Sequence, residues 1–512
     1  MSVRVMIGAD VGTTGCRAVV FRPDGTALTA ASREYPLYTP QPGWAEQDAE
    51  EIYQALVATV REALATAALP PEAEIGMCLS TFFHSIMPVD ESGQPLHRML
   101  IWADTRGARY VERLAAERDA AALYARTGCM LSPMYPLVKI LWFKEERPDI
   151  FRRTARFVSV KEYILFRLLG RFVVDRSIAT GTGMYDIKGW RWDAELLELL
   201  GLDVGQLSRV EATTHVESGL RPAAAAALGV SPALSVVLGA GDGVLSNLGT
   251  GAIGPGQVAT MIGTSGAVRT VMNRPFSHPE RRTWCYNLTD RHWAAGVAMN
   301  SGGIALRWLR DTLGEAERAA AAASGRDAYD ALTAMAAQVA PGSDGLVALP
   351  FLSGERAPMW SAKSRGVFFG LTLNHGRPHL VRAMMEGVMY CMYGIFQPVR
   401  EAAGRVTEIR AAGSFTRSPL WVQMMADVFG LPVAVPGEPS GSAYGAALLG
   451  LYAQGLIADL DAAAAKVPVT ARYEPDAANH RVYQEYYRLF EELAAKLTPE
   501  FTAVAALQEG KA

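Results

Sequence analysis

The stretch of residues 7–21 constrains the fold more than any other part of this chain. Two apolar runs with strand-forming residues, 3–9 and 17–21, flank a short turn rich in glycine and threonine. Such runs on either side of a glycine-rich turn are typical of two antiparallel strands. The sequence therefore predicts a β-hairpin near its N-terminal end.

The turn of this hairpin has the composition of an anion site. Its glycines, Gly12 and Gly15, permit backbone angles that a side chain would forbid. Backbone N–H groups and the hydroxyls of Thr13 and Thr14 are then free to face an anion. Asp10 stands where the first strand ends, and since a carboxylate repels phosphate, its expected partner is a hydrated Mg²⁺ that carries the phosphate. The alternative interpretation is an ordinary hairpin with a solvated Asp10.

The same pattern recurs in residues 258–271, where two apolar runs flank Gly263, Thr264 and Ser265. A similar unit in each half of a long chain indicates duplication. Two such hairpins are suited to hold one phosphate chain from both sides. A chain of 512 residues is also too long for one ordinary core, so two domains are expected.

These two motifs carry a resemblance. Asp-Val-Gly-Thr-Thr-Gly at residues 10–15, with Gly-Thr-Ser-Gly at 263–266, resembles the superfamily of sugar kinases, Hsp70 and actin, whose two hairpins hold the phosphates of ATP. Within it the chain is similar, along nearly its whole length, to the FGGY carbohydrate kinases, and residues 135–142 and 366–387 resemble two family signatures. The resemblance implies an α/β fold of two ribonuclease H-like (actin-like ATPase) domains, each a mixed β-sheet flanked by helices, with the active site in the interdomain cleft. We place the domains at residues 1–245 and 246–512.

Two polar segments that follow predicted strands are candidates for substrate binding. Phe83 and His84 come after the strand 74–81, and Trp102, Asp104 and Arg106 come after the strand 99–101. Open α/β sheets bind ligands at such strand ends, and a polyol needs directed hydrogen bonds beside an aromatic platform. The alternatives are a structural His84, and an Asp104 that caps a helix and pairs with Arg106 on the surface. In FGGY kinases, which this chain resembles, these two places line the sugar pocket.

Asp242 is the candidate catalytic residue and a second substrate contact. It follows the apolar strand 235–240 and lies between Gly241 and Gly243, so it is exposed and open to close approach by a hydroxyl. A turn aspartate would look the same, but the resemblance implies that FGGY kinases place their catalytic base here. Lys139, in the first signature segment, is expected to be solvated, with an approach to the substrate as the alternative.

Two glycine loops of the second half are candidates for nucleotide binding. Gly302 precedes the helix 304–313 and allows close approach to a nucleotide. Gly413 opens a loop that leads into the helix 420–429, a fair place for an adenosine. From that loop we select Gly413, Ser414, Phe415, Arg417 and Ser418. Most FGGY kinases have three glycines there, so the departure leaves the adenine contacts open.

A phosphoryl transferase needs a phosphate cradle with a metal, an in-line hydroxyl and a group that accepts its proton. The candidate residues supply these parts, so we expect ATP and Mg²⁺ as cofactors and transfer of the γ-phosphate to a terminal primary hydroxyl of an open-chain sugar or sugar acid. The loop at 413–418 resembles gluconate kinases, and the layout fits xylulose kinases equally, so D-gluconate and D-xylulose stay open. Ribulose, glycerol and a non-kinase ATPase switch like actin or Hsp70 are the alternatives.

Composition limits the setting and the partners. The net charge is −3 without a dense run of Lys or Arg, so the sequence shows no positively charged patch that would bind nucleic acid or an anionic membrane. No leader and no apolar run of about 18 residues is present, so we expect a cytoplasmic protein. The five scattered cysteines lack Cys-x-x-Cys spacing and are expected to be buried free thiols. A small sugar or sugar acid and ATP are the expected partners, and a homodimer is left open.

Overall fold

The computed structural model describes residues 3–325, 327–438 and 440–510, and the chain forms two compact units. Unit 1 comprises Met1–Gly254, Val271–Ala295 and Glu438–Val467, and unit 2 comprises Pro255–Thr270, Gly296–Gly437 and Pro468–Ala512. The first segment of unit 1 ends close to the predicted boundary, but two later segments also belong to unit 1. Each unit combines helices with strands, which confirms the predicted two-domain α/β class.

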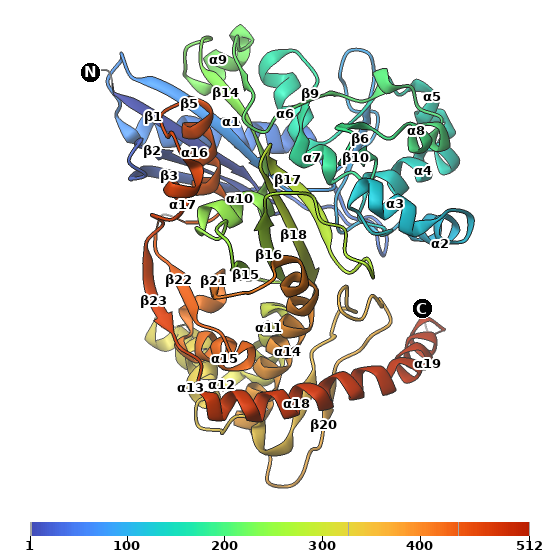
Figure 1. The fold of residues 1–512 in the computed structure, drawn as a ribbon, viewed down its shortest axis with the longest axis vertical. Helices are drawn as coiled ribbons and strands as arrows, with labels where there is room; N and C mark the ends of the chain where they lie inside the picture. The colour runs from blue at the N-terminus through green and yellow to red at the C-terminus, as the bar shows by residue number, and fades with distance from the viewer. Residues whose placement is uncertain (1–2, 326, 439, 511–512) are drawn as a thin grey trace. The chain divides into compact units, whose positions relative to one another are not determined.

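The first sheet has six strands and contains the predicted N-terminal hairpin (Figure 1). In spatial order the strands are β13 (Val216–Glu217), β14 (Ser235–Gly241), β5 (Glu74–Thr81), β1 (Arg4–Val11), β2 (Gly15–Phe21) and β3 (Ala27–Glu34). β1 runs antiparallel to β2 and parallel to β5, and β14 runs parallel to β5. The sheet is therefore mixed, and three parallel strands end at one edge.

Both faces of β1 are covered, because its side chains alternate between two cores. Val5, Ile7 and Ala9 pack in one cluster with helix α1 (Ala49–Ala67), and Met6 packs in another with helix α16 (Ser442–Ala453). Gly8 faces α16 so closely that a Cβ there would lie 1.9 Å from the Ala443 carbonyl oxygen. Figure 1 shows α16, from the C-terminal end of the chain, beside the N-terminal strands. Asp10 shares the parity of Met6 and Gly8, so it lies on the α16 face.

Several predicted elements begin and end as the sequence indicates. Helix α1 covers Ala49–Ala67, and the Asp48 carboxylate accepts hydrogen bonds from Glu50 N and Glu51 N as its N-cap.

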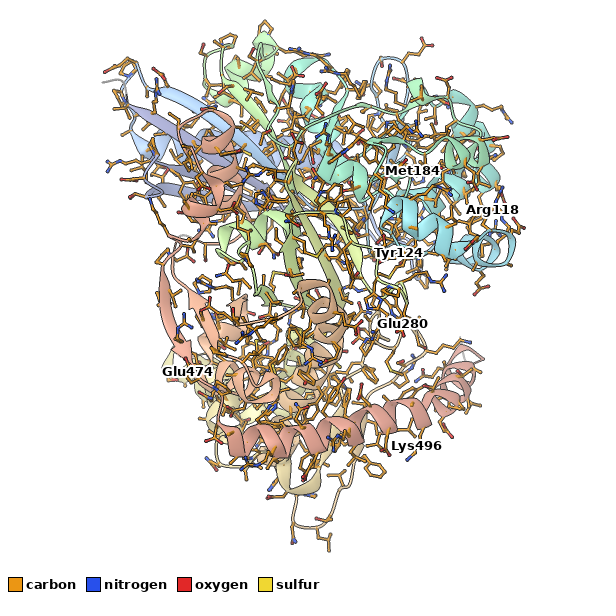
Figure 2. All side chains as sticks on the ribbon, in the orientation of Figure 1. Arg118, Tyr124, Met184, Glu280, Glu474 and Lys496 are labelled. Atoms are coloured by element: carbon orange, nitrogen blue, oxygen red, sulfur yellow. The ribbon has the colours of Figure 1, made fainter. Side chains whose placement is uncertain are left out.

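The segment 271–295 joins unit 1 through Tyr124, labelled in Figure 2, whose hydroxyl donates to the Thr283 carbonyl at 2.7 Å. All five cysteines are buried free thiols, as predicted.

The second sheet has seven strands and contains the second predicted hairpin. The order is β17 (Trp284–Thr289), β18 (His292–Met299), β16 (Gly266–Met272), β15 (Gln257–Ile262), β21 (Glu408–Ala412), β22 (Val433–Pro436) and β23 (Val469–Tyr473). β15 pairs antiparallel with β16 and parallel with β21. The core of unit 2 gathers around helix α14 (Arg377–Ala403), together with α15 (Pro419–Phe429) and α18 (Ala477–Lys496). The antiparallel β15–β16 pair confirms the second hairpin.

One local prediction about the fold differs from the structure. Asp242 was expected to be exposed and open at the end of a strand, but it is partly buried and is the first residue of helix α10 (Asp242–Gly249), most of which is buried. Gly243 and Gly249 did not prevent the helix, because α10 packs against α16 in unit 1: a Cβ on Gly249 would lie 1.9 Å from Gly441 O. Within the part of the chain that the structure describes, no helix is both long enough and apolar enough to cross a membrane.

Candidate active site

Asp10 and Asp242 lie at the same edge of the first sheet. Asp10 is level with Ser80 on the parallel neighbour β5, and Ser80 is level with Ala240 on β14. Asp242 follows two residues after Ala240. Since neighbouring strands are about 4.8 Å apart, β1, which carries Asp10, and β14, which ends just before Asp242, are about 10 Å apart. This spacing places both predicted acidic residues at one site of unit 1.

Asp10 is held by hydroxyl groups on its own side of the sheet. Its Oδ1 accepts a hydrogen bond from Ser80 Oγ at 2.6 Å. Burial raises the pKa of Asp10, while hydrogen bonds from Ser80 and Ser442 and the charge of Arg17 lower it. Burial also raises the pKa of Tyr35, and the charges of Asp10 and Asp242 add to that rise. The carboxylates of Asp10 and Asp242 therefore act on the same region around Tyr35, and their negative charge would stabilise a cation there.

The first hairpin turn presents unused donors. Its carbonyl oxygens are occupied: Gly12 O accepts from Tyr35 Oη, Thr13 O from Gln47 Nε2 at 2.6 Å, and Thr14 O from Tyr35 N at 3.3 Å. The backbone N–H groups of Thr13 and Thr14 donate no hydrogen bond to any residue that the structure describes. A turn whose acceptors are satisfied and whose donors are not is suited to an anion.

Asp242 begins α10, so its carboxylate lies at the positive end of a helix dipole. Its Oδ1 accepts a hydrogen bond from Gly243 N at 2.6 Å. Gly241 is needed for a different reason from the one predicted: a Cβ there would lie 2.0 Å from the ring of Phe83. Phe83 is 8% exposed and packs against Tyr286 with ring centroids 4.8 Å apart. The glycine therefore admits an aromatic ring beside Asp242.

His84 has an unusual backbone and a defined tautomer. Its φ is 64°, in the left-handed region that residues with side chains rarely adopt. Nδ1 lies 2.6 Å from Gly181 O, and since a carbonyl only accepts, Nδ1 carries the hydrogen. In the neutral ring Nε2 is then an acceptor, 3.5 Å from the hydroxyl of Tyr286. Tyr286 also shares a hydrogen bond of 2.9 Å with the hydroxyl of Tyr135.

Asp104 and Arg106 do not face an open pocket. Their side chains are 0% and 1% exposed and form an ion pair of 2.7 Å, and Arg106 also pairs with Glu46 at 2.7 Å. The guanidinium carbon lies 3.7 Å from the ring centroid of Trp44. Asp104 further accepts a hydrogen bond from Ala45 N at 2.8 Å. The pair therefore neither caps a helix nor lies on the surface. It is buried, and its contacts join the 43–47 segment to the loop after β7 (Met99–Leu100).

Trp102 is the residue of this segment that reaches the first hairpin. It is partly exposed, and its Nε1 donates to Thr13 Oγ1 at 2.9 Å. The indole therefore connects the candidate sugar side of unit 1 with the phosphate turn. That contact uses the hydroxyl oxygen of Thr13 as acceptor and leaves its hydroxyl hydrogen for another group.

The prediction for Lys139 was wrong: its side chain is 0% exposed. The ammonium donates to the carbonyls of His84, Ile101 and Met134 at 2.6–2.8 Å. Sequence reasoning also missed a second buried lysine, Lys161, which pairs with Asp175 at 2.7 Å and donates to Ala240 O at 3.0 Å. Lys161 lies in the first turn of α6 (Val160–Leu169), which also contains Glu162 and Arg167, so the local sequence gave no clear signal of its burial.

The second hairpin forms the matching turn in unit 2. Gly263 O and Thr264 O accept from Gly303 N at 2.7 Å and Ile304 N at 3.1 Å, at the start of α11 (Gly303–Leu313). Thr264 is exposed and Ser265 partly so. A Cβ on Gly302 would lie 2.6 Å from Ser265 O, so the structure gives Gly302 a packing role against this turn.

A pocket of about 390 Å³ lies in unit 2 beside this hairpin. Six of its lining residues were selected from the sequence: Gly263, Thr264, Ser414, Phe415, Arg417 and Ser418. Gly413 is not among them; its φ is 102°, and a Cβ there would lie 2.3 Å from Ile262 O. Gly413 therefore brings the loop against β15, next to the turn. Arg307, which the sequence did not single out, also lines the pocket.

The residues present fit a phosphate-bound Mg²⁺ better than a protein-bound one. The described residues contain no group of three or more His, Cys, Asp or Glu side chains placed to hold a metal ion. One carboxylate beside two hydroxyl groups, as at Asp10, is the kind of donor set that leaves most Mg²⁺ ligands to water and phosphate.

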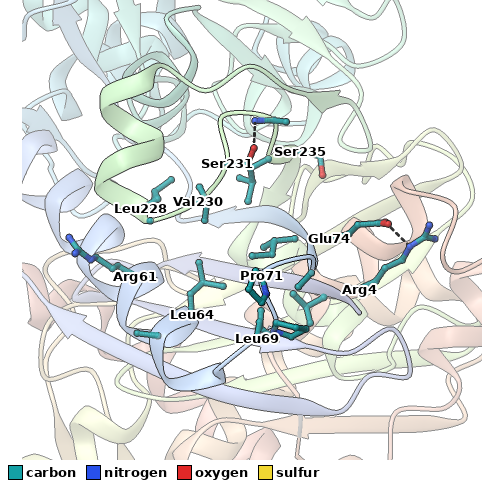
Figure 3. A pocket seen from close by; sticks show the side chains of 18 of the residues that line it. Arg4, Arg61, Leu64, Leu69, Pro71, Glu74, Leu228, Val230, Ser231 and Ser235 are labelled. Atoms are coloured by element: carbon teal, nitrogen blue, oxygen red, sulfur yellow. Dashed lines mark hydrogen bonds and ion pairs between the residues drawn. The ribbon is translucent and has the colours of Figure 1, made fainter. Parts of the chain in front are cut away.

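A larger cavity, of about 850 Å³, lies at the opposite edge of the first sheet (Figure 3). It is lined by Arg4, Glu74 and Ser235, the first residues of β1, β5 and β14. Arg4 and Glu74 form an ion pair of 2.7 Å there. Parallel sheets bind ligands beyond the carboxyl ends of their strands, where Asp10 and Asp242 lie, so this cavity is not the candidate site.

Comparisons with known proteins agree with this arrangement. The N-terminal domain model of the FGGY family of carbohydrate kinases matches residues 5–249, and the C-terminal domain model matches residues 258–454. A gluconokinase of Bacillus subtilis is 41% identical over 506 residues, which are 99% of this chain and 98% of the relative. The crystal structures of a gluconate kinase and a xylulose kinase, both from Lactobacillus acidophilus, superpose with TM-scores of 0.91 at 31% and 30% identity, covering 98% of this chain and 100% of each. The chain therefore belongs to the FGGY family of carbohydrate kinases.

Proposed function

We propose that this carbohydrate kinase transfers the γ-phosphate of ATP to the terminal primary hydroxyl of D-gluconate. ATP is the phosphate donor of FGGY kinases. The observation that carries the proposal is the placement of Asp242 at the head of α10, on the same sheet edge as Asp10 and the donor-rich turn of the first hairpin. D-Gluconate is preferred because the gluconokinase relative is 41% identical over the whole chain.

In this proposal Asp242 orients the acceptor hydroxyl and takes its proton. A sugar hydroxyl is too weak an acid to ionise first, so the proton leaves as the new bond between oxygen and phosphorus forms. The bond from the γ-phosphorus to the bridging oxygen breaks at the same stage, and ADP leaves with that electron pair. The carboxylate of Asp242 needs only to be ionised and within hydrogen-bond reach.

Unit 1 supplies the sugar side and one phosphate turn. We assign His84 and Trp102 as sugar contacts, because both are partly exposed and held in fixed orientations. Asp104 and Arg106 are proposed as the support beneath them. Since Arg106 is buried and already pairs with two carboxylates, we do not assign it to the gluconate carboxylate, and the choice of D-gluconate does not rest on it.

Unit 2 supplies the nucleotide side. The 390 Å³ pocket beside Thr264 is proposed to hold the adenosine, next to the turn of the second hairpin. Mg²⁺ is proposed to neutralise the phosphate charge, with Asp10 and Ser80 on its hydration shell. We further propose a cytoplasmic setting, where ATP is available, and a homodimer, which light scattering in solution would test.

Release of ADP from ATP, measured against a panel of polyols, tests the proposal. D-Gluconate should stimulate ADP release far above the rate without sugar, and NMR should place the phosphate on the terminal carbon of the product. Strong stimulation by D-xylulose with none by D-gluconate would instead support the second candidate, which the xylulose kinase structure at TM-score 0.91 favours. Glycerol and L-ribulose complete the panel.

A further inference from the structure

Lys139 is a fully buried cation without a carboxylate partner. It lies on helix α4 (Pro136–Glu146), and its side chain is 0% exposed. No Asp or Glu among the described residues lies within ion-pair distance of its ammonium; the three hydrogens instead go to three backbone carbonyls at 2.8, 2.6 and 2.7 Å. An ammonium has three donors and no acceptor, so its capacity is fully used.

Two of the three carbonyls belong to or adjoin the proposed sugar contacts His84 and Trp102, and the third adjoins Tyr135, whose ring packs against His84. One is the carbonyl of His84 itself. The others, of Ile101 and Met134, are in the peptide bonds that lead into Trp102 and Tyr135. The rings of His84 and Tyr135 lie 4.9 Å apart, nearly perpendicular. One ammonium therefore fixes three loops that come from distant parts of the sequence.

The backbone of His84 needs such a restraint. Its φ of 64° is in the left-handed region, which is costly for a residue with a side chain unless the surroundings hold it. Two of the contacts that hold His84 are hydrogen bonds to its neighbours: its Nδ1 donates to Gly181 O, and its carbonyl accepts from Lys139. Loss of either contact would let the imidazole leave the position that Tyr286 and Tyr135 define.

Burying this charge is expensive, which argues against a purely structural role. Burial lowers the pKa of Lys139 to about 7, the charge of Asp104 raises it, and the charge of Arg106 lowers it. Apolar residues of similar volume can often replace even buried ion pairs without loss of stability. An apolar residue could not, however, bond three carbonyls at one point.

We propose that Lys139 is a positioning residue for the sugar site, which holds the backbone of His84, Trp102 and Tyr135 in the arrangement that binds the acceptor. The inference rests on the proposed function, because it takes these side chains as the sugar side. Lys139 itself does not touch the sugar; it acts through the three loops. Its loss should therefore change sugar binding more than nucleotide binding.

The test compares Lys139→Met with Lys144→Met on the same helix. Methionine keeps the length and volume of the buried stem and removes the donors. Lys144 donates a single bond, to Leu199 O at 2.9 Å, and is remote from the three loops. We expect Lys139→Met to raise the KM for the sugar at least about tenfold, with the KM for ATP and the sugar-independent ATP hydrolysis within about twofold of wild type. Lys144→Met should leave all three values unchanged.

The outcomes separate this inference from the proposed function. Wild-type enzyme that no sugar stimulates overturns the proposed function. Wild-type enzyme stimulated by sugar, beside a folded Lys139→Met with unchanged sugar KM, overturns only the positioning role. If Lys139→Met does not fold, Lys139→Arg and Lys139→Gln are measured in the same way, and a rise in sugar KM alone supports the inference. Failure of all three variants to fold, while Lys144→Met folds, contradicts it, because Lys139 would then serve the fold as a whole.

Discussion

The proposed sugar side of unit 1 and the proposed nucleotide pocket of unit 2 are built in opposite ways. Around the sugar side, charged residues are buried and bonded to each other or to backbone: Arg106 is 1% exposed and Lys139 is 0% exposed. Around the 390 Å³ pocket, Arg307 and Arg417 are exposed and pair with no carboxylate among the described residues. A sugar is bound by many directed hydrogen bonds, so the loops that make them must be rigid. A nucleotide is charged, so exposed cations can bind it on a more open surface.

This contrast shows that two residues with the same functional group can have different roles in the two units. Arg106 and Arg417 have the same guanidinium and both lie in segments that resemble functional motifs of the family. Arg106 forms ion pairs with Asp104 and Glu46, so we propose that it supports the site from beneath. Arg417 is exposed and lines the 390 Å³ pocket, where we propose that it contacts a ligand. The four predictions below test this difference.

The largest expected effect is on turnover, at Asp242, the proposed catalytic base of unit 1. Asp242→Asn keeps the shape of the side chain but removes the proton acceptor, so kcat should fall by about 10² to 10⁴-fold. Dissociation constants for ATP and sugar should change little, which calorimetry would measure. Asp24→Asn, at an exposed turn of the same unit, is the control and should keep normal turnover. Unchanged kcat in Asp242→Asn would remove the base assignment, and lost sugar binding would make Asp242 an anchor.

The second prediction sets Arg106→Met against Arg417→Met. Removing Arg106 leaves Asp104 and Glu46 buried without their cation, which should cost about 3–5 kcal/mol in the free energy of unfolding. Arg417 is exposed, so its removal should change that free energy by less than about 0.5 kcal/mol. The KM for ATP should instead rise about three- to tenfold in Arg417→Met. Denaturant unfolding and steady-state kinetics measure the two effects; equal loss of stability in both variants would contradict the comparison.

Sequence patterns predicted the elements well and the roles of individual side chains less well. Both hairpins follow from apolar runs around glycine-rich turns, and α1 follows from its Asp48 cap and apolar period. These are local signals. The burial of Lys139 and Arg106 depends instead on partners 30 to 60 residues away, such as Ile101 O and Glu46, which no local pattern reveals. The start of α10 at Asp242 was missed because glycines normally weaken a helix, and here its packing against α16 outweighs that cost.

The third prediction uses the low pKa of Lys139, about 7 in the folded protein against an ordinary value of 10.5. Between these values the unfolded chain holds a proton that the folded protein has released, so rising pH favours the folded state. Wild type should therefore gain up to about 1.4 kcal/mol per pH unit relative to Lys139→Met between pH 7 and 10. Below pH 7 the difference should be constant, because lysine is protonated in both states.

Denaturant unfolding of both proteins from pH 6 to pH 10 gives this difference directly. Lys144→Met is again the control, and its difference from wild type should not depend on pH in the same way. A difference between wild type and Lys139→Met that stays flat across the range would mean that the three carbonyls keep the ammonium protonated. The hydrogen bonds to the carbonyls would then stabilise the charged form of Lys139 enough to offset the effect of burial on its pKa.

The smallest expected effect concerns the loop that shapes the nucleotide pocket. Gly413 has a φ of 102°, and a Cβ there would lie 2.3 Å from Ile262 O. Gly413→Ala should therefore push residues 414–418 away from the second hairpin and raise the KM for ATP about tenfold, the equivalent of about 1.4 kcal/mol. Gly404→Ala is the matched control, because Gly404 also has a positive φ, 73°, but its Cβ would meet nothing within 4 Å. It should lose some stability and keep its KM for ATP. The sugar KM should be unchanged in both variants, because the loop belongs to unit 2 and the sugar side to unit 1; a rise in the sugar KM of Gly413→Ala would show that the two sides are coupled and not built independently.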